Sequence, residues 1–374
     1  MNKQYTGKQV IKAGEILLEE NINDPEFDAA MDILSYWRFS HEIPLGKALE
    51  ILRGTTLEID SDAIFAKRLK RYPSIVNKLK RFRKMKLKNM QDIGGCRAIV
   101  STPKKLQKVV RALRKRPEFK NSKGKIRFKD YITQPKEDGY RSYHLVGQFR
   151  DEYNELKDIE LQVRTHLQHD WATAVEIVDL FTGQALKSNQ GNQDWEKFFS
   201  FVSKQFAVME SIHLFNTLPY PRKLHEYINK IHENNDTIES CHETQTITKK
   251  LEVVNVFNAF THSLNIVDGK IEENSLEGYV LVEVDIEKSI VKTTFFKQDD
   301  NKEAEKMYIE AEKKSAGQSN LVIALVSTTA VGGIKDAYPN YFADSTEFLR
   351  HLLIVTETPV KTHKSIFHNL FFPN

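Results

Sequence analysis

The sequence predicts an α+β fold, with a mixed β-sheet domain flanked by helices and a small α+β domain at the C-terminal end. The first observation is that β-rich runs and amphipathic helical segments alternate between residues 74 and 181. The second is that further strand-like and helical runs follow residue 251, after a polar stretch. A chain of 374 residues with 40% hydrophobic and 28% charged residues has the length and composition of a folded protein with two domains.

The N-terminal segment is expected to be helical from residue 8 to residue 53. Trp37, Leu45 and Leu49 recur at roughly helical spacing, and Pro44 marks an expected break. The central part then mixes the two types of element. Its expected helices are 74–85, 104–116 and one that begins near 166, and its expected strands are 96–102, 125–133, 142–150 and 159–165.

The C-terminal part is predicted as a hairpin, a helix, a buried strand and a last helix. The strands are 278–286, 289–296 and 320–327, and the helices are 301–315 and 343–354, the last with Asp344 or Ser345 as its cap. Residues 232–246 are polar and lack periodicity, which is typical of a linker. We therefore predict a first domain over residues 1–215, a helical and polar linker over 216–250, and a C-terminal domain over 251–374.

The net charge of +4 conceals two strongly basic segments. Residues 67–91 contain eleven Lys or Arg and residues 104–116 contain seven, and neither segment contains an acid. Solvated helix faces would explain such segments. However, unbalanced charge in neighbouring segments repels itself, and a polyanionic partner relieves that repulsion. The pattern therefore favours a phosphorylated ligand.

The cysteines and the apolar stretches indicate the expected cellular location of the protein. Cys96 and Cys241 form no framework of pairs, and the first 21 residues have no signal-like apolar core. The most apolar stretch, 321–334, is too short and too polar to span a bilayer. We expect a cytoplasmic protein that has no contact with membranes.

Candidate functional residues lie in four successive pieces of the central region. The first piece holds a spaced set of basic and hydroxyl side chains, the second and fourth each hold an acid near a strand, and the third is the loop 129–144, "KDYITQPKEDGYRSYH". In chain order the residues are Arg68, Lys70, Ser74 and Lys78, then Asp92 and Arg97, then the loop, then Glu160, Gln162 and Arg164 on one strand face. The loop suits a flat phosphorylated ligand, although its Asp-Gly turn alone would also explain it.

Two acids on adjacent strands, surrounded by Lys and Arg, favour nucleotide chemistry. Such acids can hold Mg²⁺ against a triphosphate, while the basic groups neutralise charge on the phosphates. One carboxylate can also accept a proton from an attacking hydroxyl group. Buried acids that merely pair with Arg are the alternative for each residue alone. A P-loop kinase is not indicated, because no GxxxxGK[ST] occurs.

These motifs resemble the synthetase domain of the RelA/SpoT family, which moves pyrophosphate from ATP to a ribose 3′-hydroxyl group. The resemblance rests on "RLKRYPSIVNKLKR", "DIGGCRAIV", "DGYRSYH" and "IELQVRT", in matching order over about 100 residues. It implies that Arg68 and Arg97 flank the adenine and that Lys70, Ser74 and Lys78 hold the phosphates of ATP. It also implies that Asp92 binds Mg²⁺ and that Glu160 shares the metal or activates the 3′-hydroxyl group.

The resemblance also implies roles around the acceptor. Tyr140 and His144 would position it, and the basic cleft would be completed by Lys129, Lys136, Arg141, Gln162, Arg164 and His169. Asp138 differs from the family, whose alarmone makers commonly carry Asn before Gly-Tyr, and an acid there would weaken a guanine-nucleotide contact. The only His-Asp pair, His169-Asp170, follows the last motif, and the roughly 60 residues before Lys67 cannot hold a metal-dependent hydrolase domain. We expect no alarmone hydrolase activity.

Two further segments, 35–53 and 166–178, resemble the fused toxin–antitoxin members of the CapRel kind. That resemblance implies transfer to the 3′-CCA end of tRNA, which stops translation. It also implies a C-terminal antitoxin or sensor domain that restrains the enzyme until a phage protein binds. Tyr338 and Tyr341, in "YPNYF", would then block the ATP site.

Three functions therefore stay open at this point. The first is a self-inhibited tRNA pyrophosphokinase, favoured because tRNA needs a basic surface outside the pocket. The second is a (p)ppGpp synthetase that uses GDP or GTP, with a regulatory C-terminal domain. The third is a nucleotide or RNA sensor that retains the pocket without catalysis, and the presence of both acids argues against it.

Overall fold

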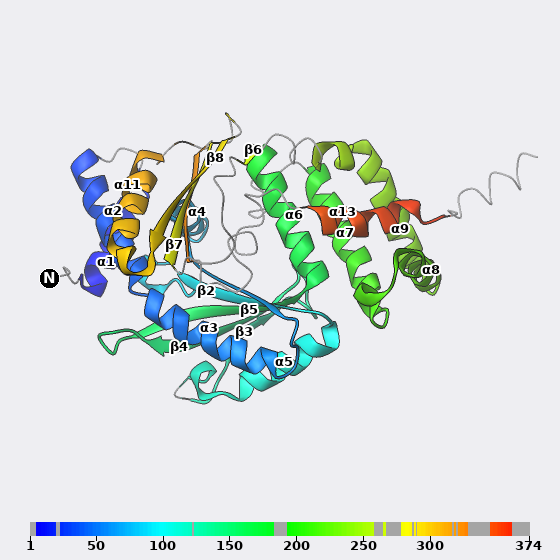
Figure 1. The fold of residues 1–374 in the computed structure, drawn as a ribbon, viewed down its shortest axis with the longest axis horizontal. Coiled ribbons are helices and arrows are strands. Elements are labelled where there is room, and N and C mark those ends of the chain that lie inside the picture. Colours follow the sequence, from blue (N-terminus) through cyan, green and yellow to red (C-terminus); the bar gives the residue numbers. More distant parts are fainter. Residues whose placement is uncertain are drawn as a thin grey trace, which may run out of the picture.

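The computed structural model describes residues 5–19, 23–121, 123–182, 193–257, 265–266, 278–285, 288, 290–315, 318, 321–327 and 345–360. Over these ranges the chain forms a five-stranded mixed sheet, a helical bundle and a four-stranded sheet (Figure 1). The α+β class predicted from the sequence is confirmed. Among the described residues, no helix is both long enough and apolar enough to cross a membrane.

Three helices begin the chain: α1 (Gly7–Ile16), α2 (Asp24–Phe39) and α3 (Glu42–Leu57). The break between α2 and α3 falls at Ser40 and His41, before the expected position, Pro44. Pro44 lies in the first turn of α3 instead, where a proline costs no helical hydrogen bond because that turn's N–H groups have no partner within the helix.

The five-stranded sheet holds the motifs singled out in the sequence. Its strands are β1 (Ile64–Leu69), β2 (Gly94–Val100), β3 (Arg127–Asp130), β4 (Tyr143–Arg150) and β5 (Leu156–Thr165). Their order in the sheet is β1-β2-β5-β4-β3. Only β2 and β5 pair in parallel, and every other pair in this sheet is antiparallel. Motifs that are far apart in sequence therefore lie on neighbouring strands.

Helices cover one face of this sheet and leave the other for the site. Leucines and valines of α3 and of α5 (Pro103–Lys115) pack on the apolar face, where Phe65, Leu145 and Leu161 are buried. The apolar spacing that predicts a helix over 104–116 is confirmed, since Leu106, Val109, Val110 and Leu113 all face this core. Between β1 and β2 the chain forms α4 (Tyr72–Arg81), which packs on α1 and α2.

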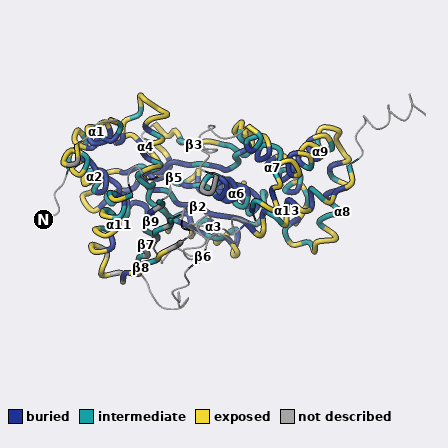
Figure 2. The backbone as a smooth tube through the Cα atoms, turned by 90° about the horizontal axis from the view of Figure 1, so that it is seen from above, coloured by how far each residue is buried: buried dark blue, intermediate teal, exposed yellow. Residues whose placement is uncertain are grey.

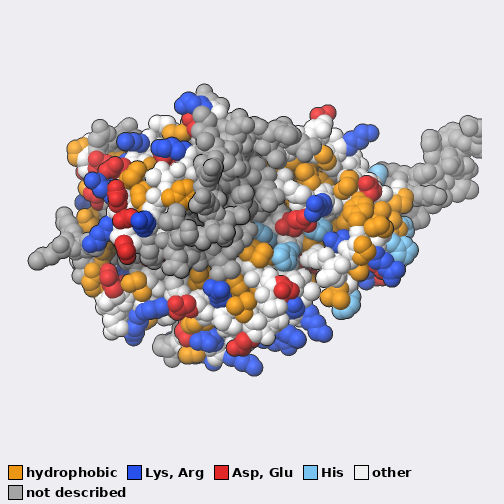
Figure 3. Space-filling view, viewed as in Figure 1, with side chains coloured by type: hydrophobic (Ala, Val, Ile, Leu, Met, Phe, Trp, Pro, Cys, Tyr) orange, Lys and Arg blue, Asp and Glu red, His pale blue; other side chains and the backbone are white. Residues whose placement is uncertain are grey.

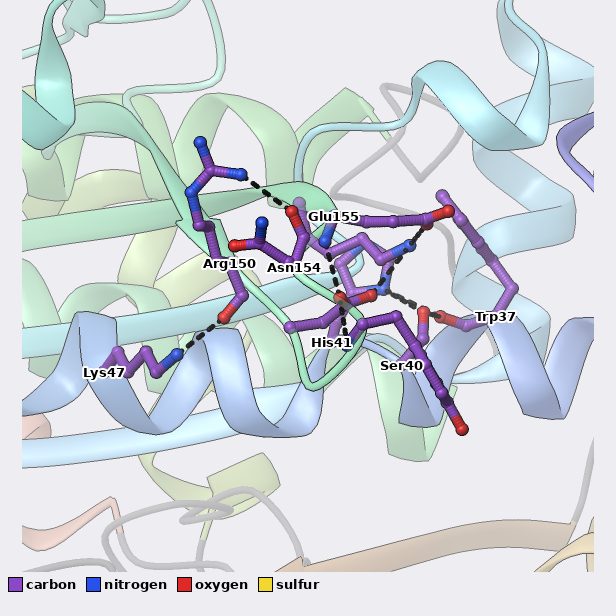
Figure 4. Close-up of polar contacts among 10 residues, drawn as sticks. Trp37, Ser40, His41, Lys47, Arg150, Asn154 and Glu155 are labelled. Carbon is purple, nitrogen blue, oxygen red and sulfur yellow. Dashed lines mark hydrogen bonds and ion pairs between the residues drawn. The ribbon is translucent and has the colours of Figure 1, made fainter. Parts of the chain in front are cut away.

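The corner between α2 and α3 docks onto the hairpin between β4 and β5 (Figure 4). His41 Nδ1 donates to the carbonyl oxygen of Trp37 at 2.7 Å, and burial lowers the pKa of His41 to about 4, so the imidazole is neutral. Lys47 Nζ donates to the carbonyl oxygen of Arg150 at 2.8 Å, and Arg150 in turn donates to that of Asn154 at 2.7 Å. The bond from Lys47 to Arg150 ties α3 to the end of β4, while the other two bonds order the corner and the hairpin themselves.

A helical bundle follows β5 and packs around a second core. It contains α6 (His166–Thr182), α7 (Gln193–Ser211), α8 (Tyr220–Ile231), α9 (Asn235–Lys250) and, from the far end of the chain, α13 (Thr346–Glu357). Figure 2 shows α6 and the five-stranded sheet as mostly buried at the centre of the molecule.

Residues 232–246, expected to lack regular structure, belong mostly to α9. The buried face of α9 is largely small or polar, with Ser240, Cys241, Thr244 and Thr248 among its buried residues. A face of this composition gives no apolar periodicity, which explains why the sequence pattern missed the helix.

The second sheet has the order β6-β8-β7-β9 and is built from β6 (Asn265–Ile266), β7 (Gly278–Asp285), β8 (Ile290–Lys297) and β9 (Leu321–Ser327). Helix α11 (Asn301–Ser315) packs on it through Ala304 and Tyr308. The predicted hairpin, helix and strand are confirmed. The division into three domains stays a prediction, and α13 shares its core with α6, α7 and α9 rather than with this sheet. Ser345 is the N-cap of α13, and Asp344 lies outside the described residues.

Candidate active site

Two lysines converge on Asp92 at the start of β2. Lys70 follows β1, and its Nζ lies 2.9 Å from Asp92 Oδ2, while Nζ of Lys78, on α4, lies 2.8 Å from Asp92 Oδ1. The backbone N–H of Lys70 donates to the carbonyl oxygen of Ile93 at 2.7 Å, which holds the end of β1 beside the turn that carries Asp92. The motif residues 70, 78 and 92 therefore meet at one point.

The electrostatics of this point favour an ionised Asp92. Burial raises the pKa of the carboxyl group, but the Lys70 and Lys78 ammonium groups outweigh it and lower the pKa to about 2. Burial also lowers the pKa of Lys70, an effect that Asp92 opposes. Lysines held this way can exchange the carboxylate for the phosphates of a nucleotide without a new cost of desolvation.

The second carboxylate, Glu160, lies on the neighbouring strand β5. Glu160 Oε1 lies 3.1 Å from His144 Nδ1, and Glu160 Oε2 accepts a hydrogen bond from Gln162 Nε2 at 2.8 Å. Burial raises the pKa of Glu160, but His144 outweighs it and holds the pKa below its usual value. The charge of Asp92 acts on Glu160 in the opposite direction, so the two carboxylates are close enough to interact.

A hydrogen-bonded chain continues from Glu160 to the loop before β4. The Tyr140 hydroxyl oxygen lies 2.8 Å from His144 Nε2. With its proton on Nδ1, His144 donates to Glu160 and accepts from Tyr140. Burial raises the pKa of Tyr140 to about 12, so this hydroxyl group stays protonated at neutral pH.

The loop is closed by turn chemistry and by a lysine over two aromatic rings. Asp138 Oδ1 accepts from the N–H of Tyr140 at 2.8 Å, and Gly139 takes a φ of +90°, which favours glycine. Lys136 Nζ lies 4.8 Å from the centre of the Tyr140 ring and 4.9 Å from that of Tyr131. The expected turn is confirmed, and the binding of a phosphorylated ligand by this loop stays a prediction.

A second group of expected residues, Arg97 on β2, Arg164 on β5 and His169 on α6, lies near these hydrogen-bonded residues. Arg97 and Arg164 are buried, and Arg97 pairs with Gln162 in the strand register. Burial, together with the charges of Arg97 and Arg164, lowers the pKa of His169 well below its usual value. His169 is therefore neutral at pH 7. Its neighbour Asp170 has Oδ2 3.6 Å from His351 Nδ1 on α13.

The remaining expected residues lie around the two carboxylates or outside the described part of the chain. Arg68 lies on β1, not at a helix start, and lines a cleft with Tyr279 and Tyr308 of the second sheet and its helix. Ser74 is half-buried on α4, and Lys129 is exposed on β3 opposite His144 in the strand register. Arg141 Nη1 pairs with Glu210 Oε2 at 2.5 Å. Tyr338 and Tyr341 lie outside the described residues.

Three further residues of the site were not predicted individually from the sequence. Tyr131 contacts both Tyr140 and His144, with ring centres 5.8 and 5.2 Å apart. Glu210 on α7 reaches the Tyr140 loop through its pair with Arg141. Glu312 on α11 accepts a hydrogen bond from the backbone N–H of Tyr72 at 3.3 Å, at the start of α4. Of the three, only Tyr131 lies in a stretch, the loop 129–144, that the sequence singled out.

Comparison with known proteins finds similarity over the part of the chain that carries these motifs. Residues 67–178 match the region found in RelA/SpoT proteins. Over 118 residues the chain is 35% identical to the GTP pyrophosphokinase YwaC of Bacillus subtilis. This match covers 28% of this chain and 52% of that protein. Over 92 residues it is 36% identical to the GTP pyrophosphokinase YjbM of the same organism, which covers 23% of this chain and 41% of that protein. The chain thus spans about half the length of these curated relatives or less.

Two solved structures are similar to about half of the chain. The small alarmone synthetase 1 of B. subtilis bound to its product pppGpp matches with a TM-score of 0.40 at 25% identity, over 47% of this chain and 93% of that chain. The same protein bound to AMPCPP matches with a TM-score of 0.36 at 21% identity, over 47% and 92%. Every residue singled out between Arg68 and His169 falls within the matched region 67–178. The candidate site therefore lies in the part of the chain that is similar to the region found in RelA/SpoT proteins.

Proposed function

We propose that the protein transfers pyrophosphate from ATP to the 3′-hydroxyl group of a ribose. The observation that carries this proposal is the pair of interacting carboxylates, Asp92 and Glu160, beside the parallel strands β2 and β5. One of them is held by two ammonium groups, and the other begins a hydrogen-bonded chain to Tyr140. This arrangement separates a phosphate side of the site from an acceptor side.

The residues present suit a magnesium ion, which the family generally uses with ATP. Mg²⁺ in nucleotide sites is held by one or two carboxylates together with substrate phosphates, and Asp92 and Glu160 supply that number. Both carboxyl groups have lowered pKa values, so both are ionised at neutral pH and able to act as ligands. When bound, the ion would neutralise charge on the transferred phosphates.

The protein's own residues bind the phosphates and accept the proton of the attacking hydroxyl group. Lys70, Lys78 and Ser74 bind the phosphates and orient them, and Arg68 on β1 flanks the adenine. The 3′ oxygen forms a bond to the β-phosphorus as the bond from that phosphorus to the α–β bridging oxygen breaks, and AMP leaves. The proton of the hydroxyl group passes to Glu160, and His144 and Tyr140 hold that carboxylate in place.

A guanine nucleotide, GDP or GTP, is the acceptor that we propose first, which makes the protein a (p)ppGpp synthetase. The two curated relatives are named GTP pyrophosphokinases, and a solved relative is bound to pppGpp. Asp138, which differs from the alarmone makers, uses Oδ1 to close its own turn, as an asparagine would. A cytoplasmic location, where these nucleotides are available, is part of the proposal.

A second candidate acceptor is the 3′ end of tRNA, and one surface favours it. Lys104, Lys108, Arg111 and Lys115 are exposed on α5 at spacings of four, three and four residues, and so share one helix face. Among the described residues, no carboxylate pairs with any of the four. Figure 3 shows Lys and Arg side chains along the lower edge of the molecule, where Figure 1 places α5. A stripe of this kind suits a phosphate backbone.

Contacts of the C-terminal part favour inhibition of the enzyme by its own C-terminal part, which is a feature of the tRNA-modifying candidate. Tyr279 and Tyr308 line a cleft together with Arg68, and Glu312 accepts a hydrogen bond at the N-terminus of α4. A helix N-terminus attracts phosphate groups, so a carboxylate there competes with ATP. A phage protein that binds the C-terminal part and withdraws it would activate the enzyme.

A label-transfer assay tests the function and distinguishes the acceptors. The full chain and the Glu312→Gln variant would be incubated with γ-labelled ATP and Mg²⁺, with GDP, GTP or deacylated tRNA offered in parallel and Asp92→Asn as the control. A truncated chain is unsuitable, because Phe348 of α13 covers Phe198 and Phe206 in the bundle core. Label on GDP or GTP supports the first acceptor, and label on tRNA alone replaces it with the second. No label on any acceptor with either chain would overturn the function.

A further inference from the structure

One buried carboxylate on α7 joins two of the motifs outside its own helix. Glu210 has a side chain that is 4% exposed, and its Oε2 lies 2.5 Å from Nη1 of Arg141, which is 12% exposed. Its Oε1 accepts hydrogen bonds from the hydroxyl group of Thr165 and, at 3.0 Å, from Gln168 Nε2. Glu210 therefore contacts the Tyr140 loop, the last residue of β5 and the first turn of α6.

Helix α7 contacts the same loop at a second point. Ser203 Oγ donates to the carbonyl oxygen of Gly139 at 2.5 Å, one residue before Tyr140. Residues 203 and 210 are seven apart and so lie on the same face of α7. A side chain at Gly139 would come within 2.9 Å of Ser203 Cβ, so the loop approaches this helix as closely as a glycine allows.

The two contacts, at Gly139 and Arg141, lie on either side of Tyr140, the residue proposed to position the acceptor. Tyr140 lies between Gly139 and Arg141, and its ring also lies 6.2 Å from that of Trp171, whose Nε1 donates to the carbonyl oxygen of Phe199 on α7 at 2.8 Å. By contrast, the ion pairs of Lys70 and Lys78 go to Asp92, and among the described residues none of them involves α7. The geometry thus links α7 to only one side of the site.

We propose that Glu210 is a positioning residue for the acceptor, acting through Arg141 to fix the loop that carries Tyr140, the hydrogen-bond partner of His144 on β4. This inference rests on the proposed pyrophosphate transfer. Glu210 lies outside residues 67–178, so the RelA/SpoT region depends on a residue beyond its own matched boundary. Arg141 is consequently a structural partner of Glu210 and not a free phosphate ligand.

The test compares Glu210→Gln with wild type in steady-state transfer, varying ATP and the acceptor separately. Glutamine keeps the shape and one acceptor oxygen but removes the charge that pairs with Arg141. We expect the KM for the acceptor to rise about tenfold or more, the effect of breaking one buried ion pair, and the KM for ATP to stay within about twofold. Glu210→Asp should restore part of the acceptor affinity.

A matched control and a second pair variant keep the test decisive. Asp194, also on α7, pairs with Lys250 at 2.7 Å on the surface, so Asp194→Asn should leave both KM values unchanged. Adding Arg141→Gln to Glu210→Gln should raise the acceptor KM little further, because the pair is already broken. Unchanged acceptor KM in Glu210→Gln, or equal rises for ATP and acceptor, would overturn the positioning role alone. A wild-type chain that transfers pyrophosphate to no acceptor would overturn the proposed function and this inference together.

Discussion

The buried pair between Arg38 on α2 and Glu312 on α11 gives a sharp test of how the second sheet is attached. Arg38 Nη1 lies 2.7 Å from Glu312 Oε2, and the two side chains are 3% and 2% exposed. Tyr308 hydrogen-bonds to both, and its ring centre lies 4.9 Å from the Arg38 guanidinium carbon. Burial acts to lower the pKa of Arg38, but Glu312 and Tyr308 outweigh it, so the guanidinium group stays charged.

Replacing Glu312 with Gln leaves that guanidinium charge buried without a counter-charge. Removing one partner of a buried pair typically costs about 3 to 5 kcal/mol. That cost is a large part of the roughly 5 to 15 kcal/mol that stabilises an ordinary domain. Because α11 is attached to α2 at this point, we expect the loss to appear first as detachment of α11 and its sheet.

Urea unfolding and hydrogen exchange would measure this effect. We expect Glu312→Gln to lower the free energy of unfolding by about 3 kcal/mol and to speed exchange over residues 301–315. The control is Lys313→Ala on the same helix, whose pairs with Asp28 and Asp32 are at the surface and should contribute under about 1 kcal/mol. A loss below about 1 kcal/mol in Glu312→Gln, with unchanged exchange, would refute the reasoning.

Three further outcomes are expected. Asp92→Asn should lower the transfer rate at least about a thousandfold, measured in the label-transfer assay, because it removes a proposed metal ligand and leaves Lys70 and Lys78 without their counter-charge. Folding lowers the pKa of Asp92 from 3.8 to about 2. The ionised carboxylate therefore contributes about 2 kcal/mol to the free energy of unfolding above about pH 5, and this contribution is lost as the pH falls through about 2. The urea midpoints of wild type and Asp92→Asn should therefore converge as the pH falls over that range. Cys96 and Cys241 are buried, and burial raises the pKa of both thiols, so a thiol reagent such as DTNB should label neither at pH 8 until urea unfolds the chain.

The sequence by itself determined the parts of this protein whose signal is local. The apolar spacing of α5, the strand-like runs of β4 and β5 and the C-terminal hairpin were all predictable, because periodicity reports which face of an element is buried. The motif residues Lys70, Lys78, Asp92 and Glu160 were also predictable as a set, since their types and order suit phosphate and metal chemistry. Helix α9 was not, because its buried face is small and polar.

Only the tertiary structure decided which distant residues meet. The register between the parallel strands β2 and β5 sets Gly95 beside Glu160, which brings Asp92 and Glu160 within electrostatic reach. Arg38 and Glu312 are 274 positions apart, and Glu210 meets Arg141 only because α7 packs against the Tyr140 loop. Each of these pairs depends on how whole elements dock, which is set by the combined burial of many side chains and not by the residues of either partner's own segment.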